Sequence, residues 1–259
     1  NFHLARVVAA VVAMVALARG RLATGGALLA FAALAKISPA ILGVELVARR
    51  RWRAVGWTVG WAVVWCLAVL PVLGASPWVA FFEHDLPALR SGRAFPFLER
   101  SLNEIANNFS PFGLPFKLRE LGLDVGWPEA RVAGEIYSVA LLGIAVLAAL
   151  RLGSAPPRGH RLRVWLALLT LAALRSPFAT QMAFVGVAWL LVLLAEDCRK
   201  RWQVAGLVVL WPLLTVGAPM ESVAPALVLS FVRQGLLFAG LIWLALRSPV
   251  ASVPDPETA

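Results

Sequence analysis

SPWVAFFEHDLPALRSGRAFPFLERSLNEIANNFSPFGLPFKLRELGLDVGWPEAR, residues 76–131, is the long segment of this chain that is too polar to lie within a bilayer. It holds half of the fourteen acidic residues, and apolar runs flank it on both sides. Ser76 and Pro77 begin a segment with aromatic and leucine residues at helical spacing, which predicts a helix lying flat on the membrane surface. Further short helices are predicted from the capping-box spacing at Ser101 and from residues 115–121, which Gly122 closes. We therefore expect a folded cap outside the membrane.

The rest of the chain is apolar and basic. Hydrophobic residues make up 60% of the sequence and the net charge is +10. This composition predicts an all-α polytopic membrane bundle of about eight spans. The positive charge lies in short clusters beside hydrophobic runs, which indicates membrane orientation rather than nucleic-acid binding. The clusters at 49–53, 151–163 and 199–201 are therefore expected in the cytoplasm with both chain ends, and the cap outside.

The expected organisation follows from these runs. Residues 1–75 hold three predicted spans, residues 132–246 hold five, and residues 247–259 lack an apolar period and are expected to be disordered. One span is unusual, because residues 162–174 are too short to cross the hydrocarbon core before residues 175–178 interrupt the helix. Lipid cannot satisfy a bare turn, so we expect this broken helix to face protein or a water-filled cavity.

Four motifs then occur in a recognisable order: KISP at 36–39, the arginine run at 49–53, external NNFS at 107–110 and SP at 176–177. This pattern resembles glycosyltransferase family 87, which are GT-C mannosyltransferases of the bacterial plasma membrane. The resemblance implies a GT-C-like fold and transfer of mannose from a polyprenyl-phosphate donor to a lipid-linked or periplasmic glycan acceptor. It covers only the later part of the family's pattern. We therefore expect a fragment that begins after the external loop carrying the family's catalytic acid.

Two cations are predicted to bind the donor phosphate. Arg175 lies at the predicted break, with Ser176 as cap and Pro177 at the first position of the next helix, so free amides and the helix dipole favour a phosphate there. The alternative is an arginine that extends to the membrane interface. Lys36 falls near the middle of the second span, at 24–48, and must meet an acid, a carbonyl or water. Pairing with Glu45 or with an acid of another helix is the structural alternative.

The cap supplies the other candidates. Glu83, His84 and Asp85 are the nearest candidates for the base that accepts the acceptor's proton, although the solvated polar face of an amphipathic helix is the simpler interpretation. Polar and aromatic side chains that are candidates for binding sugar or acceptor are Trp78, Asn103, Glu104, Asn107 and Asn108. The alternative for the asparagines and Glu104 is a role in caps and turns.

No glycine-rich phosphate loop, metal-ligand spacing or Ser/His/Asp arrangement is visible, so we expect no cofactor and no metal. The expected partners are the polyprenyl-phosphate sugar, the glycan or glycolipid acceptor and membrane lipids, without nucleic acid. Two other classes fit the same composition: a lipid or polysaccharide transporter, and an inactive membrane fragment that lacks the catalytic acid.

Overall fold

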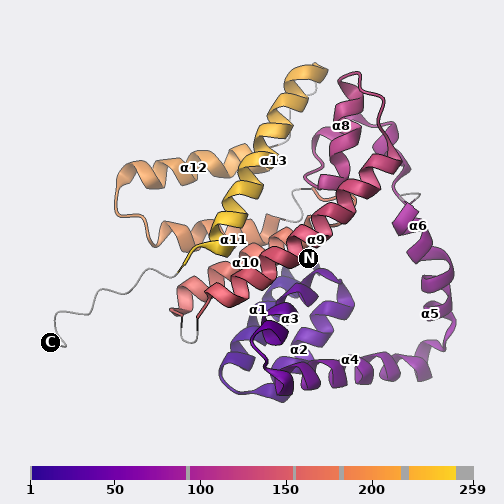
Figure 1. Ribbon diagram of the computed structural model, residues 1–259, viewed down its shortest axis with the longest axis vertical. Helices are drawn as coiled ribbons and strands as arrows, with labels where there is room; N and C mark the ends of the chain where they lie inside the picture. Colours follow the sequence, from indigo (N-terminus) through magenta and orange to yellow (C-terminus); the bar gives the residue numbers. More distant parts are fainter. Residues whose placement is uncertain (1, 92–93, 154–155, 181–183, 217–221, 249–259) are drawn as a thin grey trace.

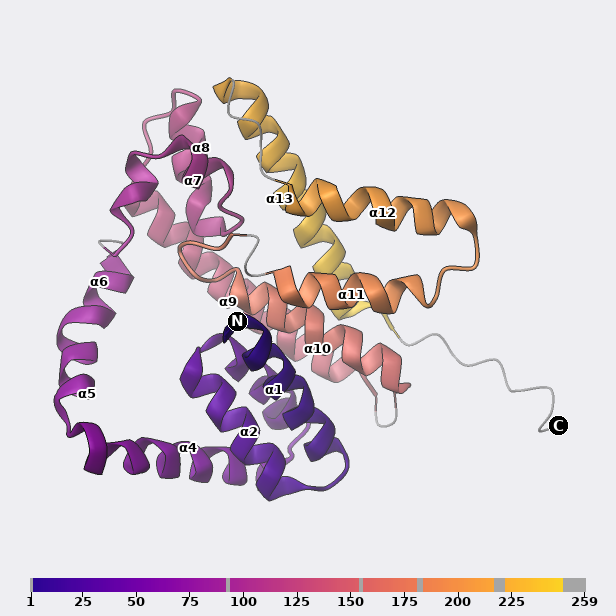
Figure 2. The same cartoon turned by 180° about the vertical axis from the view of Figure 1, so that it is seen from behind.

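The computed structural model describes residues 2–91, 94–153, 156–180, 184–216 and 222–248. Every regular element within these residues is helical and none is a strand, which confirms the all-α prediction. Figures 1 and 2 show an N-terminal group and a C-terminal group of helices, with the long helix α9 (Trp127–Arg151) running between them. The predicted tail at 247–259 lies outside the described residues, apart from Arg247 and Ser248.

The N-terminal group is held together by close approach of its backbones. It comprises α1 (Phe2–Ala18), α2 (Leu22–Ala35), α3 (Ile41–Ala48) and α4 (Trp52–Leu73). A Cβ atom at Gly25 would meet the side chain of Leu17 at 2.6 Å, and one at Gly26 would meet the backbone of Trp57 at 2.9 Å. Small residues let membrane helices approach in this way. α2 therefore packs on α1 with one face and on α4 with another.

The predicted second span is divided into two helices. α2 ends at Ala35, Lys36 is extended with φ −160° and ψ 135°, and a 3-10 turn, η1 (Ser38–Ala40), precedes α3. Proline has no amide hydrogen, so Pro39 cannot donate the hydrogen bond that a continuous helix would need at this position. Pro39 therefore contributes to a complete break, where the sequence predicted one span over residues 24–48.

Among the described residues, three helices are long and apolar enough to cross a membrane: α4, α9 and α13 (Val223–Leu246). Shorter helices fill the remaining predicted spans: α1, α2 with α3, α10 (Arg158–Ala173), α11 (Val185–Ala195) and α12 (Arg201–Thr215). With 11 residues, α11 extends about 16 Å, roughly half of the hydrocarbon core. The chain is thus an integral membrane protein. Of the eight predicted spans, three correspond to long apolar helices and the others to shorter ones.

Residues 76–131 form the predicted series of short helices. In order these are α5 (Ser76–Ala80), the π-helical turn η2 (Phe81–Asp85), α6 (Leu86–Ser91), η3 (Pro96–Glu99), α7 (Leu102–Ala106), η4 (Pro111–Gly113) and α8 (Leu114–Glu120). Gly122 follows α8 with φ +96°, and the Ser101 hydroxyl accepts a hydrogen bond from the Glu104 amide at 3.3 Å. Both local predictions are confirmed. From η3 onwards the cap has its own buried core, which includes Leu98, Ile105, Phe112 and Phe116 and reaches Leu227 of α13.

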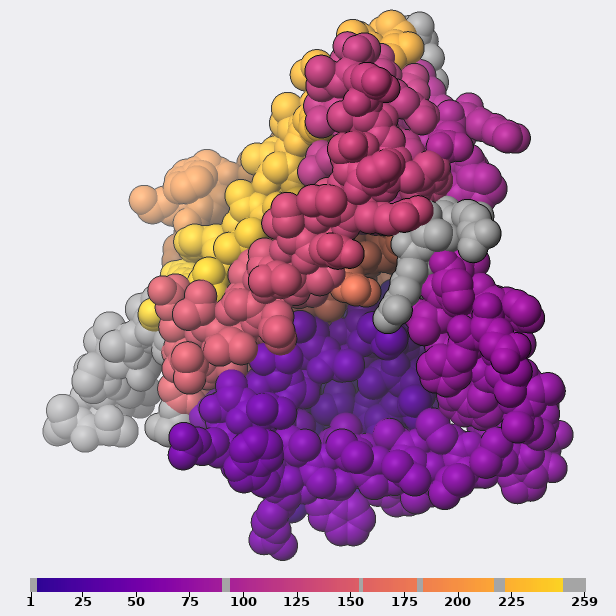
Figure 3. All heavy atoms as spheres, turned by 45° about the vertical axis from the view of Figure 1, so that its right-hand side comes forward, coloured from indigo at the N-terminus to yellow at the C-terminus, as the bar shows by residue number. Residues whose placement is uncertain are grey.

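The first part of the cap stands apart from this core. In Figures 1 and 2, α5, η2 and α6 curve away from the end of α4 toward the rest of the cap, and we call residues 76–91 the arch. Figure 3 shows a hollow enclosed by the magenta arch, the indigo N-terminal helices and α9. Phe81 and Phe82 of the arch are exposed, and Phe82 is 60% accessible.

Candidate functional site

Residues 108–109 of the cap are bonded directly to the break after α10. The side chain of Asn108 is fully buried and makes three hydrogen bonds to backbone groups. Its Nδ2 donates to the carbonyl of Pro177 at 2.9 Å, and its Oδ1 accepts from the amides of Ser110 and Ala179, each at 3.0 Å. The amide of Phe109 also donates to the carbonyl of Ala179 at 2.8 Å. We call this set of contacts the clasp.

Aromatic rings extend the clasp. The rings of Phe97 and Phe178 meet edge to face at 4.9 Å, and those of Phe109 and Phe184 at 4.6 Å. Such pairs each contribute about 0.5–1.5 kcal/mol beyond their buried area. A Cβ atom at Gly113 would come within 2.6 Å of the Asn108 side chain, so glycine is needed there to leave room for the asparagine. The cap and the broken helix therefore form one packed unit.

The break itself is longer than predicted. α10 ends at Ala173, residues 174–178 form turns and bends, and α11 begins at Val185. The helix expected to open at Ser176 is therefore absent, and no helix dipole points at Arg175 from that position. The cause lies in the clasp, because the backbone groups of Ala179 bond to Asn108 and Phe109 instead of to a following helical turn. Phosphate binding by Ser176 stays a prediction without that support.

Arg175 lies at the surface beside α9. Its Nε donates a hydrogen bond to the hydroxyl of Ser138 at 2.7 Å, and that hydroxyl donates to the carbonyl of Gly134, also at 2.7 Å. The side chain is exposed. The guanidinium is thus fixed at its near end by α9 and remains accessible from outside.

The break at 36–39 borders a small pocket. Its lining comes from four parts of the chain: Arg6 and Val7 of α1, Ser38 and Pro39 of η1, Leu169, Thr170 and Ala173 of α10, and Gly186 of α11. Lys36 is partly buried and lies within electrostatic range of Arg6. Lys36 is thus near Arg6 but is not one of the residues that line the pocket, and Arg175 bonds to α9.

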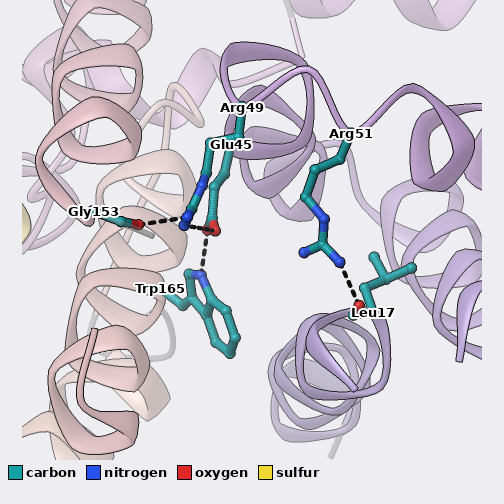
Figure 4. A network of polar contacts seen from close by, with 6 residues as sticks. All are labelled: Leu17, Glu45, Arg49, Arg51, Gly153 and Trp165. Atoms are coloured by element: carbon teal, nitrogen blue, oxygen red, sulfur yellow. Dashed lines mark hydrogen bonds and ion pairs between the residues drawn. The ribbon is translucent and has the colours of Figure 1, made fainter. Parts of the chain in front are cut away.

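Glu45, the alternative partner of Lys36, is committed elsewhere. Its carboxylate is buried and accepts hydrogen bonds from Trp165 Nε1 at 2.6 Å and from Arg49 at 3.4 Å. Figure 4 shows this carboxylate between α3 and α10, with Arg49 also reaching the carbonyl of Gly153. In the same view Arg51 donates to the carbonyl of Leu17, at 2.6 Å. This network ties the N-terminal group to α10, and Glu45 forms its ion pair with Arg49 rather than with Lys36, the partner considered as the alternative.

The base candidates all lie on the π-helical turn. Glu83, His84 and Asp85 are exposed on η2, and Trp78 is partly buried one turn earlier in α5. Single π-helical turns inside helices are frequent at functional sites. No group of three or more His, Cys, Asp or Glu side chains in the described part of the chain could hold a metal ion.

The other predicted sugar ligands make local contacts. The Nδ2 of Asn107 donates to the carbonyl and to the side-chain oxygen of Asn103, at 3.0 and 2.8 Å. The Glu104 amide bonds to Ser101, as a helix cap requires. The structure therefore brings Asn103, Glu104 and Asn107 together on α7, while Asn108 points into the clasp.

Sequence reasoning missed a buried polar cluster between the cap and α13. Lys117 of α8 and Arg233 and Gln234 of α13 are each at most 3% exposed. The Nζ of Lys117 donates to Oε1 of Gln234 at 2.7 Å, and Nε2 of Gln234 donates to the carbonyl of Phe109 at 3.1 Å. The available signal was an arginine in the middle of an apolar span, since ionisable residues at membrane depth are functional candidates.

These features define an all-α integral membrane protein in which an acidic, folded cap closes over a broken helix. The sequence pattern of glycosyltransferase family 87 matches residues 1–177 of the 259, and the chain belongs to this family of membrane glycosyltransferases. The match ends at Pro177, so α11, α12 and α13 lie beyond it. Neither a curated protein nor a solved structure matches the sequence significantly.

Proposed function

We propose that the protein transfers mannose from a polyprenyl-phosphate donor to a lipid-linked or periplasmic glycan acceptor. Family membership supports glycosyl transfer, and the clasp is the observation that supports this site, because it holds an extramembrane cap against a break beside the exposed Arg175. In this proposal the cap faces the periplasm, while the basic loops and both chain ends lie in the cytoplasm of a bacterium. The shorter helices would complete the bundle of eight spans within the plasma membrane.

The donor phosphate is assigned to Arg175, Ser176 and Lys36. A guanidinium binds phosphate oxygens through charge-assisted hydrogen bonds and needs no metal to do so. Arg175 has the access that this requires. Lys36 lies at a second break, next to a pocket that is lined in part by Arg6 and Ser38. The isoprenoid tail then extends between helices, where apolar surface is exposed to lipid.

The transfer step is assigned to the arch and to α7. The acceptor hydroxyl attacks the anomeric carbon, the bond from that carbon to the phosphate oxygen breaks, and polyprenyl phosphate leaves with the electron pair. A carboxylate takes the hydroxyl proton, for which Glu83 and Asp85 are the candidates with His84 beside them. The side chains proposed to bind the sugar and the acceptor are Trp78, Asn103, Glu104 and Asn107, whereas the buried Asn108, also a candidate from the sequence, is assigned to the clasp.

The test uses the full-length protein in nanodiscs with radiolabelled polyprenyl-phosphate mannose and a glycolipid acceptor. Label should appear covalently in the acceptor, and Glu83→Gln or Asp85→Asn should reduce its rate by about 10²-fold or more for whichever carboxylate is the base. Arg100→Gln, an exposed cation of the cap, serves as the control. Movement of label across the bilayer without a covalent product would replace this function by transport. No movement and no product would indicate an inactive scaffold.

A further inference from the structure

Lys117 and Arg233 are two buried cations that interact electrostatically, and no acid among the described residues forms an ion pair with either. Lys117 and Arg233 are both 0% exposed, and Arg233 is the charged group that acts on Lys117. Neither side chain enters any of the ion pairs formed by the described residues. The interior between α8 and α13 therefore carries up to two positive charges that are not balanced locally.

The donors of this pair are only partly used. Arg233 Nη2 donates to the carbonyl of Leu214 at 2.8 Å, whereas its Nε and Nη1 are buried and have no hydrogen-bond partner among the described residues. Lys117 donates to Gln234, and the amide of Gln234 is held by Phe109 of the clasp. A buried polar group without a partner costs free energy, and a buried charge without one costs more. The unused donors are thus the unexplained part of this cluster.

Aromatic rings explain only part of the arrangement. The guanidinium of Arg233 lies 5.1 Å from the ring of Phe109, and the ammonium of Lys117 lies 5.7 Å from that of Phe231. Contacts of a cation with a ring face attract it but accept no conventional hydrogen bond and carry no negative charge. Burial, together with Arg233, lowers the pKa of Lys117 to about 7, so an anion at this place would hold the lysine in its charged form.

We propose that Lys117 and Arg233 form a phosphate-binding site between the cap and α13, separate from Arg175 and Lys36. Arg233, through its Nε and Nη1, and Lys117, through its ammonium, supply N–H donors of the kind from which a phosphate monoester accepts hydrogen bonds. Gln234 and Phe109 connect this site to the clasp, so its occupant would bear directly on how the cap is held. A free phosphate and a lipid phosphate share this chemistry, and the choice of an isoprenoid phosphate rests on the proposed function.

The test measures binding without acceptor, so it does not depend on transfer. Full-length protein in detergent is titrated by calorimetry with farnesyl phosphate, with farnesol and with inorganic phosphate. Farnesyl phosphate should bind and farnesol should bind at least tenfold more weakly, while binding of inorganic phosphate alone would identify the free anion as the ligand. In protein that already carries Arg175→Ala, Arg233→Gln and Lys117→Gln should each weaken the remaining phosphate binding by about tenfold or more, and Arg100→Gln should leave it unchanged.

Further variants keep the proposal open to refutation. If the glutamine variants fail to fold, Lys117→Arg and Arg233→Lys replace them in the test. These variants retain the charge and should retain phosphate binding. Arg175→Ala should leave a phosphate bound at this second site. Loss of all binding in Arg175→Ala, with full binding in Arg233→Gln, would overturn the inference and leave the proposed transferase site intact. Absence of any phosphate binding in the unmodified protein would overturn it as well.

Discussion

The side-chain Nδ2 of Asn108 donates a hydrogen bond to the backbone carbonyl of Pro177 across 2.9 Å, joining residues 69 positions apart in the chain. With the two bonds accepted by Oδ1, one amide group connects the cap to the membrane part of the protein. An asparagine suits this place because it donates and accepts at the same time without carrying a charge. The motif that resembles the family's external signature thus has a structural use in this chain.

Asn108→Ala should destabilise the protein strongly. It removes three hydrogen bonds and leaves the buried amides of Ser110 and Ala179 without acceptors, which costs about 3 kcal/mol or more. Thermal unfolding in detergent should show a lowered Tm, with protease cleavage in the cap as a second readout. Asn107→Ala, which removes the hydrogen bonds from its side chain to Asn103, is the matched control. An unchanged Tm with loss of transfer would instead assign Asn108 to sugar binding.

Arg175→Ala should abolish transfer while the protein stays folded. The side chain is exposed and its bond to Ser138 contributes about 1 kcal/mol to folding, so Tm should change little. Loss of a guanidinium on the donor phosphate should lower kcat/KM by about 10²-fold. Ser138→Ala, which frees the guanidinium without removing it, should have a much smaller effect. Unchanged transfer by Arg175→Ala would end the assignment of the phosphate to this residue.

Lys117 makes stability depend on pH. Its pKa falls from the usual 10.5 to about 7 because of burial and the nearby Arg233, while Gln234 and Phe231, which also face it, are neutral. Between these pH values the unfolded chain binds more protons than the folded one. The free energy of unfolding should therefore rise from pH 7 to pH 10 by about 1.4 kcal/mol per unit in phosphate-free buffer.

The substitution Lys117→Met should flatten that rise and stabilise the protein at neutral pH. Lys200→Met is the matched control, because Lys200 is exposed in the loop before α12 and should leave the slope as it is. Unfolding followed by fluorescence at several pH values measures both. A slope in Lys117→Met as steep as that of the unmodified protein would show that other groups cause it.

Trp165→Phe should weaken the packing of the N-terminal group on α10. The substitution keeps the ring in the core but removes the donor 2.6 Å from Glu45, leaving a buried carboxylate with Arg49 as its remaining partner. The expected loss is about 1–3 kcal/mol in the free energy of unfolding. Trp202→Phe, at an exposed position of α12, is the control and should have little effect. Equal effects of the two variants would contradict a special role for the Glu45 bond.

Local signals in the sequence predicted local structure well. Ser101 begins a helix because its hydroxyl accepts a hydrogen bond from the Glu104 amide. Gly122 ends one because glycine readily adopts the positive φ found there. The non-helical conformation of residues 174–180 was beyond such reasoning, since Asn108 and Phe109, almost 70 residues earlier, take the backbone groups that a helix would have used. The Lys117–Arg233 pair was equally hidden, because one residue belongs to a polar cap and the other to an apolar span.

Most of the surface of α4 is exposed, which has a consequence for how the protein must be handled. This helix packs on α2 and, at its start, on α3, and Ala54 is its buried residue. Its 22 residues extend about 33 Å, close to the hydrocarbon thickness, so acyl chains solvate most of its circumference. Bilayers or micelles of another thickness would change its tilt. Because the arch continues from its end, the opening of the hollow in Figure 3 depends on the surrounding lipid as well as on the sequence.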